Sequence, residues 1–199
     1  MRSRDWLLAG VVSAGVFHVA FGAVAVLANV VAIQQLGGAA AAGLVASATG
    51  AGGAVGAVVA MRTRPRRPLA TGVAALAGMP VYVLVFAGPA PLAVVMAVGA
   101  AAFAGLMFYS VCWDTALQDH VPHESLGRVS SWDILTSFVG ILLGNALAGP
   151  LADAFGTSRV LVVAAAVTGV AALAPLALSG VRRLPAGAVG AADPVPALP

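Results

Sequence analysis

The stretch WDTALQDHVPHESLGRVSSWD, residues 113–133, is the only long polar break in an otherwise apolar chain. It holds four of the seven acidic residues, two of the three histidines and Arg128. The apolar runs on either side are each long enough to cross a bilayer, whose core of about 30 Å needs about 20 helical residues. A polar connector this dense, at the ends of two membrane helices, predicts a gate or a charge network.

The composition of the whole chain predicts an integral membrane protein. Of its 199 residues 61% are hydrophobic and 9% charged, with a mean hydropathy of +1.01, whereas a soluble globular domain carries about 25% charged residues. The basic residues are ten arginines in short clusters between apolar runs, which argues against nucleic-acid binding. Arginine without lysine is typical of a GC-rich bacterial coding sequence.

The apolar runs predict an all-α membrane protein with one domain of six transmembrane helices over residues 1–183. We expect helices near 7–33, 38–61, 69–88, 90–112, 132–151 and 159–180. The first run is too long for the core of a secretory signal, so we expect it to be a retained helix. Residues 184–199 are mostly Ala, Gly and Pro, which predicts a disordered cytoplasmic tail.

The arginines predict the orientation, because short cytoplasmic loops accumulate Arg and Lys. With the N-terminus inside, nine arginines are cytoplasmic and only Arg159 is outside. We therefore expect a multi-pass protein of the cell membrane with both termini in the cytoplasm.

Polar side chains within the expected helices are costly unless they are paired or face water. His18 lies near mid-membrane, where it either lines a substrate path and carries a proton or, more commonly, bonds a neighbouring helix as a neutral group. Asn29 and Asn145 carry the same alternatives. Asn145 lies beside a predicted helix-packing face of small residues at four-residue spacing, Gly140, Gly144, Ala148 and Ala152. Gly52 and Gly56 predict a second such face in the second helix.

The end of the connector resembles a helix start. Ser130 is followed three residues later by Asp133, just before an apolar run, which predicts a capping box. Asp133 also suits the positive end of the helix dipole. Asp114 lies about one turn past the fourth apolar run, at the membrane edge, facing either the cytoplasm or a cavity open to it.

Three short runs carry a family resemblance: WDTALQ at 113–118, VP at 121–122 and RVSS at 128–131. Together they resemble the loop between the tenth and eleventh helices of major facilitator superfamily transporters, in the branch of bacterial drug, macrolide and siderophore exporters. GPLAD at 149–153 and Gly156 look like the end of the eleventh helix. The expected six helices, internal termini and basic loop after the second helix match the C-terminal half of that fold.

The resemblance implies half of a transporter. Full members have twelve helices in two halves with substrate between them, so a second copy or a separate six-helix polypeptide would supply the other half. Members also carry Gly, Asp and basic residues in the loop after the second helix. Residues 62–67 keep the basic part without a nearby acid, so either a latch there uses Asp114 or Asp119, or there is no latch.

The leading functional hypothesis is proton-coupled efflux of small amphipathic compounds by alternating access. Arg128 would form cytoplasmic ion pairs with Asp114, Asp119 or Asp133 in one state, and the cavity would be lined by His18, Asn29 and Asn145. Asp114 is the acidic candidate for proton coupling, with an interface ion pair or helix cap as the alternative role.

The alternative class is a non-transporting membrane protein, either truncated or a partner subunit of a transporter. An enzyme is not expected, because no HExxH, Gly-x-Ser-x-Gly or paired-carboxylate pattern lies within a helix. The single cysteine, Cys112, forms no internal disulfide, and no cofactor or metal is expected. The expected partners are the lipid bilayer, a small-molecule substrate and a second half.

Overall fold

The computed structural model describes residues 5–63, 65–177 and 181–182, and every regular element in them is helical. Six of these segments are long and apolar enough to cross a membrane, since α3 with α4 forms one span and α7 with η1 another. The fold is therefore that expected of a multi-pass membrane protein. The helices are α1 Asp5–Gln35, α2 Gly38–Arg62, α3 Pro68–Ala75, α4 Gly78–Ala87, α5 Leu92–His120, α6 His123–Phe155, α7 Thr157–Leu173 and the 3₁₀ helix η1 Ala174–Ala177.

The six predicted spans are confirmed, but the start of α6 differs from the prediction. The helix begins at His123 with Pro122 at its N-cap, instead of at residue 132. Ser130 and Asp133 both lie inside α6, so the capping box predicted there is wrong. Glu124 occupies the first turn, where a carboxylate suits the helix dipole. The predicted tail, 184–199, lies outside the described residues.

The predicted third span is divided into two helices. α3 ends at Ala75 and α4 begins at Gly78, with the backbone N–H of Leu76 and of Ala77 bonding carbonyls three residues back. Hydrogen bonds three residues back form a 3₁₀ turn, which is wound more tightly than an α-helix, so α3 and α4 are offset from each other within the span.

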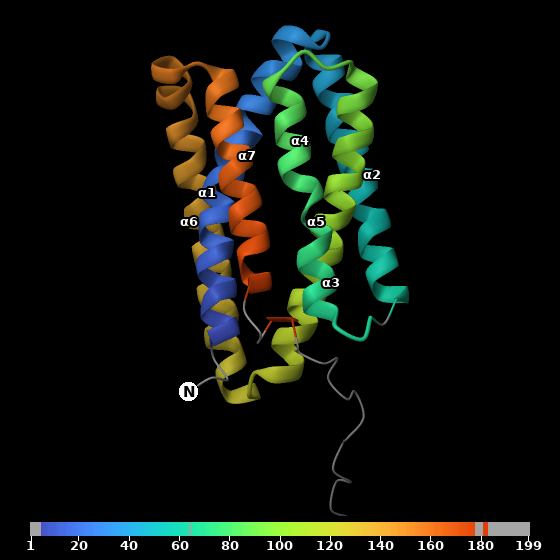
Figure 1. Cartoon of the computed structure of the whole chain (residues 1–199), viewed down its shortest axis with the longest axis vertical. Coiled ribbons are helices and arrows are strands. Elements are labelled where there is room, and N and C mark those ends of the chain that lie inside the picture. The colour runs from blue at the N-terminus through green and yellow to red at the C-terminus, as the bar shows by residue number, and fades with distance from the viewer. Residues whose placement is uncertain (1–4, 64, 178–180, 183–199) are drawn as a thin grey trace, which may run out of the picture.

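The bundle is built on two pairs of parallel helices, α1 with α6 and α2 with α5 (Figure 1). Gly140 of α6 faces the backbone of Gly15 and Val19, and Gly144, one turn further, faces Val19 and Ala23. In the second pair, Gly52 and Gly56 of α2 meet the backbone of Ala100 and Ala104. Small residues at four-residue spacing let helix backbones approach closely in a membrane, so the packing faces predicted from Gly140–Ala148 and Gly52–Gly56 are confirmed.

The remaining spans join the two pairs. α4 packs on α7, α3 and α4 pack on α5, and α7 packs on α1. A shared core between them contains fully buried Val24, Met79, Val95 and Leu161. Ser13 donates a hydrogen bond to the Ala171 carbonyl, and Ser158 donates one to the Ala87 carbonyl, so hydroxyl groups also tie α7 to its neighbours.

The pairing pattern is internally symmetric. In chain order, the first three spans are α1, α2 and α3 with α4, and the last three are α5, α6 and α7 with η1. If each of the first three is exchanged for the corresponding one of the last three, the pair of α1 and α6 becomes the pair of α5 and α2. The contact between α4 and α7 is unchanged by this exchange. Spans three apart in the chain run in opposite directions. The six spans therefore have the arrangement of an inverted repeat.

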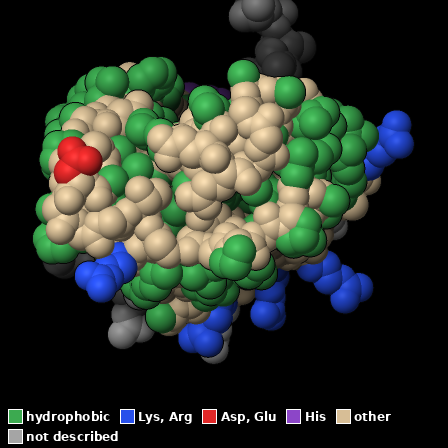
Figure 2. Space-filling model, turned by 90° about the horizontal axis from the view of Figure 1, so that it is seen from above, with side chains coloured by type: hydrophobic (Ala, Val, Ile, Leu, Met, Phe, Trp, Pro, Cys, Tyr) green, Lys and Arg blue, Asp and Glu red, His purple; other side chains and the backbone are tan. Residues whose placement is uncertain are grey.

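Charge separates the two ends of the bundle. The start of α1, the loop between α2 and α3, the turn between α5 and α6, and η1 all lie at one end (Figure 1). Exposed Arg62, Arg66, Arg67, Arg128 and Arg182 belong to that end. At the other end, in the described chain, the charged residues are Asp153 and Arg159, and Figure 2 shows mainly apolar and backbone atoms there.

Close backbone packing predicts a sharp difference between two nearby glycines of α2. A methyl group at Gly52 would collide with the Ala100 carbonyl, whereas nothing lies within 4 Å of one at Gly50. We expect Gly52→Ala to lower the free energy of unfolding by about 1–3 kcal/mol, as overpacking does. Gly50→Ala should leave it unchanged or raise it by up to about 1 kcal/mol through helix propensity.

Thermal or SDS unfolding of both variants in the same detergent measures this difference. Equal stability of the Gly52→Ala and Gly50→Ala proteins would mean that α2 and α5 do not pack as described.

Candidate functional site

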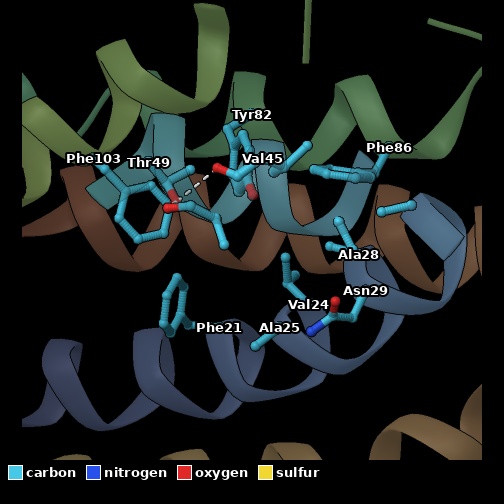
Figure 3. A pocket seen from close by; sticks show the side chains of 13 residues that line it. Phe21, Val24, Ala25, Ala28, Asn29, Val45, Thr49, Tyr82, Phe86 and Phe103 are labelled. Atoms are coloured by element: carbon cyan, nitrogen blue, oxygen red, sulfur yellow. Dashed lines mark hydrogen bonds between the residues drawn. The ribbon is translucent and has the colours of Figure 1, made fainter. Parts of the chain in front are cut away.

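A cavity of about 160 Å³ lies between the two parallel pairs, in the half of the bundle away from the arginines (Figure 3). α1 forms one wall, α2 another, and α4 and α5 close it with aromatic rings. Its lining residues are Phe21, Val24, Ala25, Ala28, Asn29 and Ala32 of α1, Ala42, Val45, Ala46 and Thr49 of α2, Tyr82 and Phe86 of α4, and Phe103 of α5.

Aromatic rings form a continuous chain along this cavity. Phe21 stacks on Phe17 with 5.9 Å between ring centroids and lies 6.1 Å from Phe103. Tyr82 makes edge-to-face contacts with Phe103 at 5.6 Å and with Phe86 at 5.2 Å. Edge-to-face contacts of this kind stabilise packed rings by about 0.5–1.5 kcal/mol each. The cavity therefore has rigid aromatic walls contributed by three different spans.

Besides the Tyr82 hydroxyl, two polar side chains line the cavity, and they differ in their bonding. The Thr49 hydroxyl lies 2.9 Å from the Ala46 carbonyl and 3.1 Å from the Val45 carbonyl, both within its own helix, so its proton is used (Figure 3). Asn29 lines the cavity and is exposed on its open side, which we call the groove. No charged side chain is among the described residues that line the cavity. Asn29 is thus the amide able to orient a bound molecule.

A second cavity, of about 330 Å³, lies beyond Phe86 toward the end of the bundle opposite the arginines. It is bounded by Gln35 and Leu36 at the end of α1 and by the turn 88–91 between α4 and α5. Phe86 lines both cavities, so its ring lies between them.

Of the three predicted cavity residues, Asn29 lines the cavity, while His18 and Asn145 lie elsewhere on the bundle. His18, Ala25 and Asn29 share one face of α1, because residues seven and four apart lie above one another in a helix. The His18 Cβ, however, lies against Gly140 of α6, so His18 is next to the contact between α1 and α6 and not in the cavity wall. Its Nδ1 lies 2.7 Å from the Ala14 carbonyl and must be the donor, which leaves Nε2 as the open ring nitrogen.

Asn145 lies on an exposed stripe of α6 together with Phe138, Leu142 and Gly149. The neighbouring residue, Gly144, faces α1, so Asn145 points about 100° away from that contact. An amide exposed at mid-span is costly in lipid and favours a protein partner or water beside it.

The polar connector places Asp133 against α5. The Trp113 indole Nε1 donates to the Asp133 Oδ2 at 3.2 Å, and Trp113 is buried, with Tyr109 stacked on it at 6.3 Å between ring centroids. Asp114 is exposed, and its carboxylate is close enough to that of Asp133 for the two to repel each other. The structure thus brings two of the predicted acidic residues together at the end of the bundle that carries the arginines.

The predicted ion pairs of Arg128 are not formed in this conformation. Arg128 is exposed, and the structure records no ion pair between it and a described acidic residue. Asp119 is exposed on the last turn of α5, on the helix that also carries Asp114. In the described residues, no group of three His, Cys, Asp or Glu side chains could hold a metal ion.

The aromatic walls of the cavity were not predicted from the sequence. Aromatic residues make up 6% of the chain, so each looks like an isolated apolar residue. The signals available were the four-residue spacings of Phe17 with Phe21 and of Tyr82 with Phe86, which stack rings on one helix face. Nothing in the sequence indicates that Phe103 joins the two.

Comparison with known protein families, with curated proteins and with solved structures finds no match to this chain. The resemblance to major facilitator transporters therefore stays a prediction carried by residues 113–131 and 149–156.

The contact between Trp113 and Asp133 predicts a measurable contribution to stability. We expect Asp133→Ala to lower the free energy of unfolding by about 1–3 kcal/mol, because the buried indole N–H loses an acceptor. Asp133→Asn keeps an acceptor oxygen and ends the repulsion from Asp114, so it should cost less. Asp153→Ala, at an exposed site on the same helix, is the matched control.

Unfolding in detergent, followed by Trp113 fluorescence in a background without the other two tryptophans, measures the effect. If Asp133→Ala is no more destabilising than Asp153→Ala, this hydrogen bond does not hold α5 to α6.

Proposed function

We propose that the protein is a half-length transporter of the major facilitator type that exports small amphipathic compounds by proton-coupled alternating access. The observation that carries the proposal is the aromatic cavity with Asn29 on its wall, lying between two parallel helix pairs and open to a groove. Secondary transporters bind substrate near the membrane midplane at the boundary between structural repeats. This cavity lies between spans of the two parallel helix pairs, which supports a comparable site.

The internal symmetry of the bundle supports the proposal. Inverted-topology repeats are a recurrent basis of secondary transporters, because two similar halves with opposite topology can favour inward-open and outward-open states in turn. The pairing of α1 with α6 and of α2 with α5 has this symmetry.

The size of the cavity supports a second half. A volume of about 160 Å³ is below the roughly 300–1,000 Å³ of small-molecule sites. In the proposal, a second copy or a separate six-helix chain covers the groove, completes the cavity and shields the exposed Asn145 from lipid. Each half then contributes part of one binding site.

The lining indicates which compounds fit. Aromatic faces attract apolar rings and also cations, whose charge is stabilised by the ring quadrupole. Asn29 adds one donor and one acceptor, without a fixed charge. The proposed substrates are therefore flat, largely apolar molecules with one polar or cationic group.

The proposed proton site is the pair formed by Asp114 and Asp133. The Trp113 indole donates to Asp133, and in the proposal the neighbouring Asp114, which is exposed, is the carboxyl that carries the proton. Arg128 would approach the pair in the other conformational state and replace the proton as its counter-charge.

A non-transporting partner subunit is the alternative, and the small cavity favours it over a self-sufficient transporter. In that case the chain binds its other half through the same groove but moves no substrate by itself.

The export hypothesis predicts a selective effect of Asn29→Leu. The substitution removes the amide that orients substrate, so export of a fluorescent lipophilic cation from proteoliposomes with an imposed proton gradient should fall roughly ten-fold, the effect of losing one hydrogen bond. Val163→Ala, on the exposed face of α7, should export normally.

The mass of the purified chain in nanodiscs accompanies this assay, with a dimer expected. Wild-type protein that is monomeric and exports nothing would contradict the transporter and leave the partner subunit.

The gating role of Arg128 predicts that Arg128→Glu cripples export while insertion and folding are unchanged, because the side chain is exposed. Arg159→Glu makes the same charge reversal at the opposite end of the bundle and should have little effect. Comparison of transport rates at equal amounts of folded protein provides the measurement, and normal export by Arg128→Glu would exclude the gate.

A further inference from the structure

The loop between α2 and α3 carries charges that the proposed transport mechanism does not use. Arg62 ends α2, Arg66 lies in the loop and Arg67 is the N-cap of α3, and all three are exposed. The structure records no ion pair between any of these three arginines and a described acidic residue. Figure 2 shows arginine side chains that reach beyond the outline of the bundle.

Apolar side chains next to these arginines place them at the membrane surface. On α2, within two turns of Arg62, the exposed fractions of Val55, Val58, Val59 and Met61 are 59%, 40%, 43% and 69%. Just past Arg67, Leu69 is buried at 1% exposed. Exposed apolar residues on a span face lipid tails, so the guanidinium groups lie where the tails end and the headgroups begin.

The backbone holds the arginines in that place. At the end of α2, the Thr63 N–H and hydroxyl both donate to the Val59 carbonyl, at 2.9 and 2.8 Å. At the start of α3, the Thr71 N–H and hydroxyl donate to the Arg67 carbonyl, at 3.0 and 2.9 Å. Both ends of the short loop are thus fixed to helices embedded in the bundle.

We propose that Arg62, Arg66 and Arg67 bind the phosphate of an anionic phospholipid in the leaflet at this end of the bundle, with an acyl chain along α2 over Val59 and Met61. Guanidinium groups bind phosphate oxygens through paired hydrogen bonds. Basic residues beside a membrane helix attract acidic lipids, and the attraction falls off within a Debye length. The inference does not depend on transport activity.

The experiment compares wild-type protein with the triple variant Arg62→Gln, Arg66→Gln, Arg67→Gln. Each protein is placed in nanodiscs of phosphatidylcholine containing a small fraction of fluorescent phosphatidylglycerol, and energy transfer from the protein tryptophans reports lipid next to the bundle. We expect wild type to enrich phosphatidylglycerol, and the triple variant to lose roughly five-fold of that preference for each arginine removed. Salt should weaken the wild-type enrichment.

Two controls make the result specific. Arg159→Gln removes an exposed arginine at the opposite end and should keep the enrichment. The thermal unfolding midpoint of the protein is also measured in neutral detergent, once with added phosphatidylglycerol and once with inorganic phosphate. This comparison distinguishes binding of a lipid from binding of a free anion. We expect only phosphatidylglycerol to raise the midpoint. Unchanged enrichment in the folded triple variant, or equal stabilisation by inorganic phosphate, would overturn the proposal.

Discussion

Close contact between the backbones of paired parallel helices is the constraint on which the rest of the bundle depends. At Gly52, Gly56 and Gly144 a single added methyl group would meet a carbonyl of the neighbouring helix. In a membrane there is no hydrophobic force between spans, so association depends on this close fit and on hydrogen bonds between helices. The two tight pairs leave α4 and α7 to join them, and a groove remains between the pairs.

The position of the candidate site follows from that arrangement. The spans that meet at the cavity belong to both pairs, so its walls are stiff within a pair but separable between pairs. Rings from α1, α4 and α5 interlock across this boundary through Phe21, Tyr82 and Phe103. A relative movement of the pairs would change the shape of the cavity without disturbing the glycine contacts. In the proposed transporter, such a movement would be the step that alternates access to the cavity.

Charged groups are concentrated at one end of the bundle, and they fall into two environments. Asp133 accepts a hydrogen bond from the buried Trp113 and so joins α6 to α5. Arg62, Arg66 and Arg67 are exposed on either side of the short loop between α2 and α3. The electrostatic interaction between partly buried charges is screened less than that between exposed charges. The acidic residues near Trp113 therefore suit a role within the protein, and the exposed arginines suit a role toward lipid.

The sequence by itself determined the class of the protein, the six spans and the two small-residue faces, because hydropathy over 20 residues and glycine spacing are local properties of the chain. It also pointed to Asn29, which lines the cavity, while the substrate-binding role predicted for it stays a prediction. Only the tertiary structure decided that Ser130 lies within α6, that Asp133 accepts from Trp113, and that Phe21, Tyr82 and Phe103 share one cavity. These features depend on which spans become neighbours, and in a chain this uniformly apolar every span has similar affinity for every other. The choice of neighbours is made by backbone fit, which the identity of single residues does not reveal.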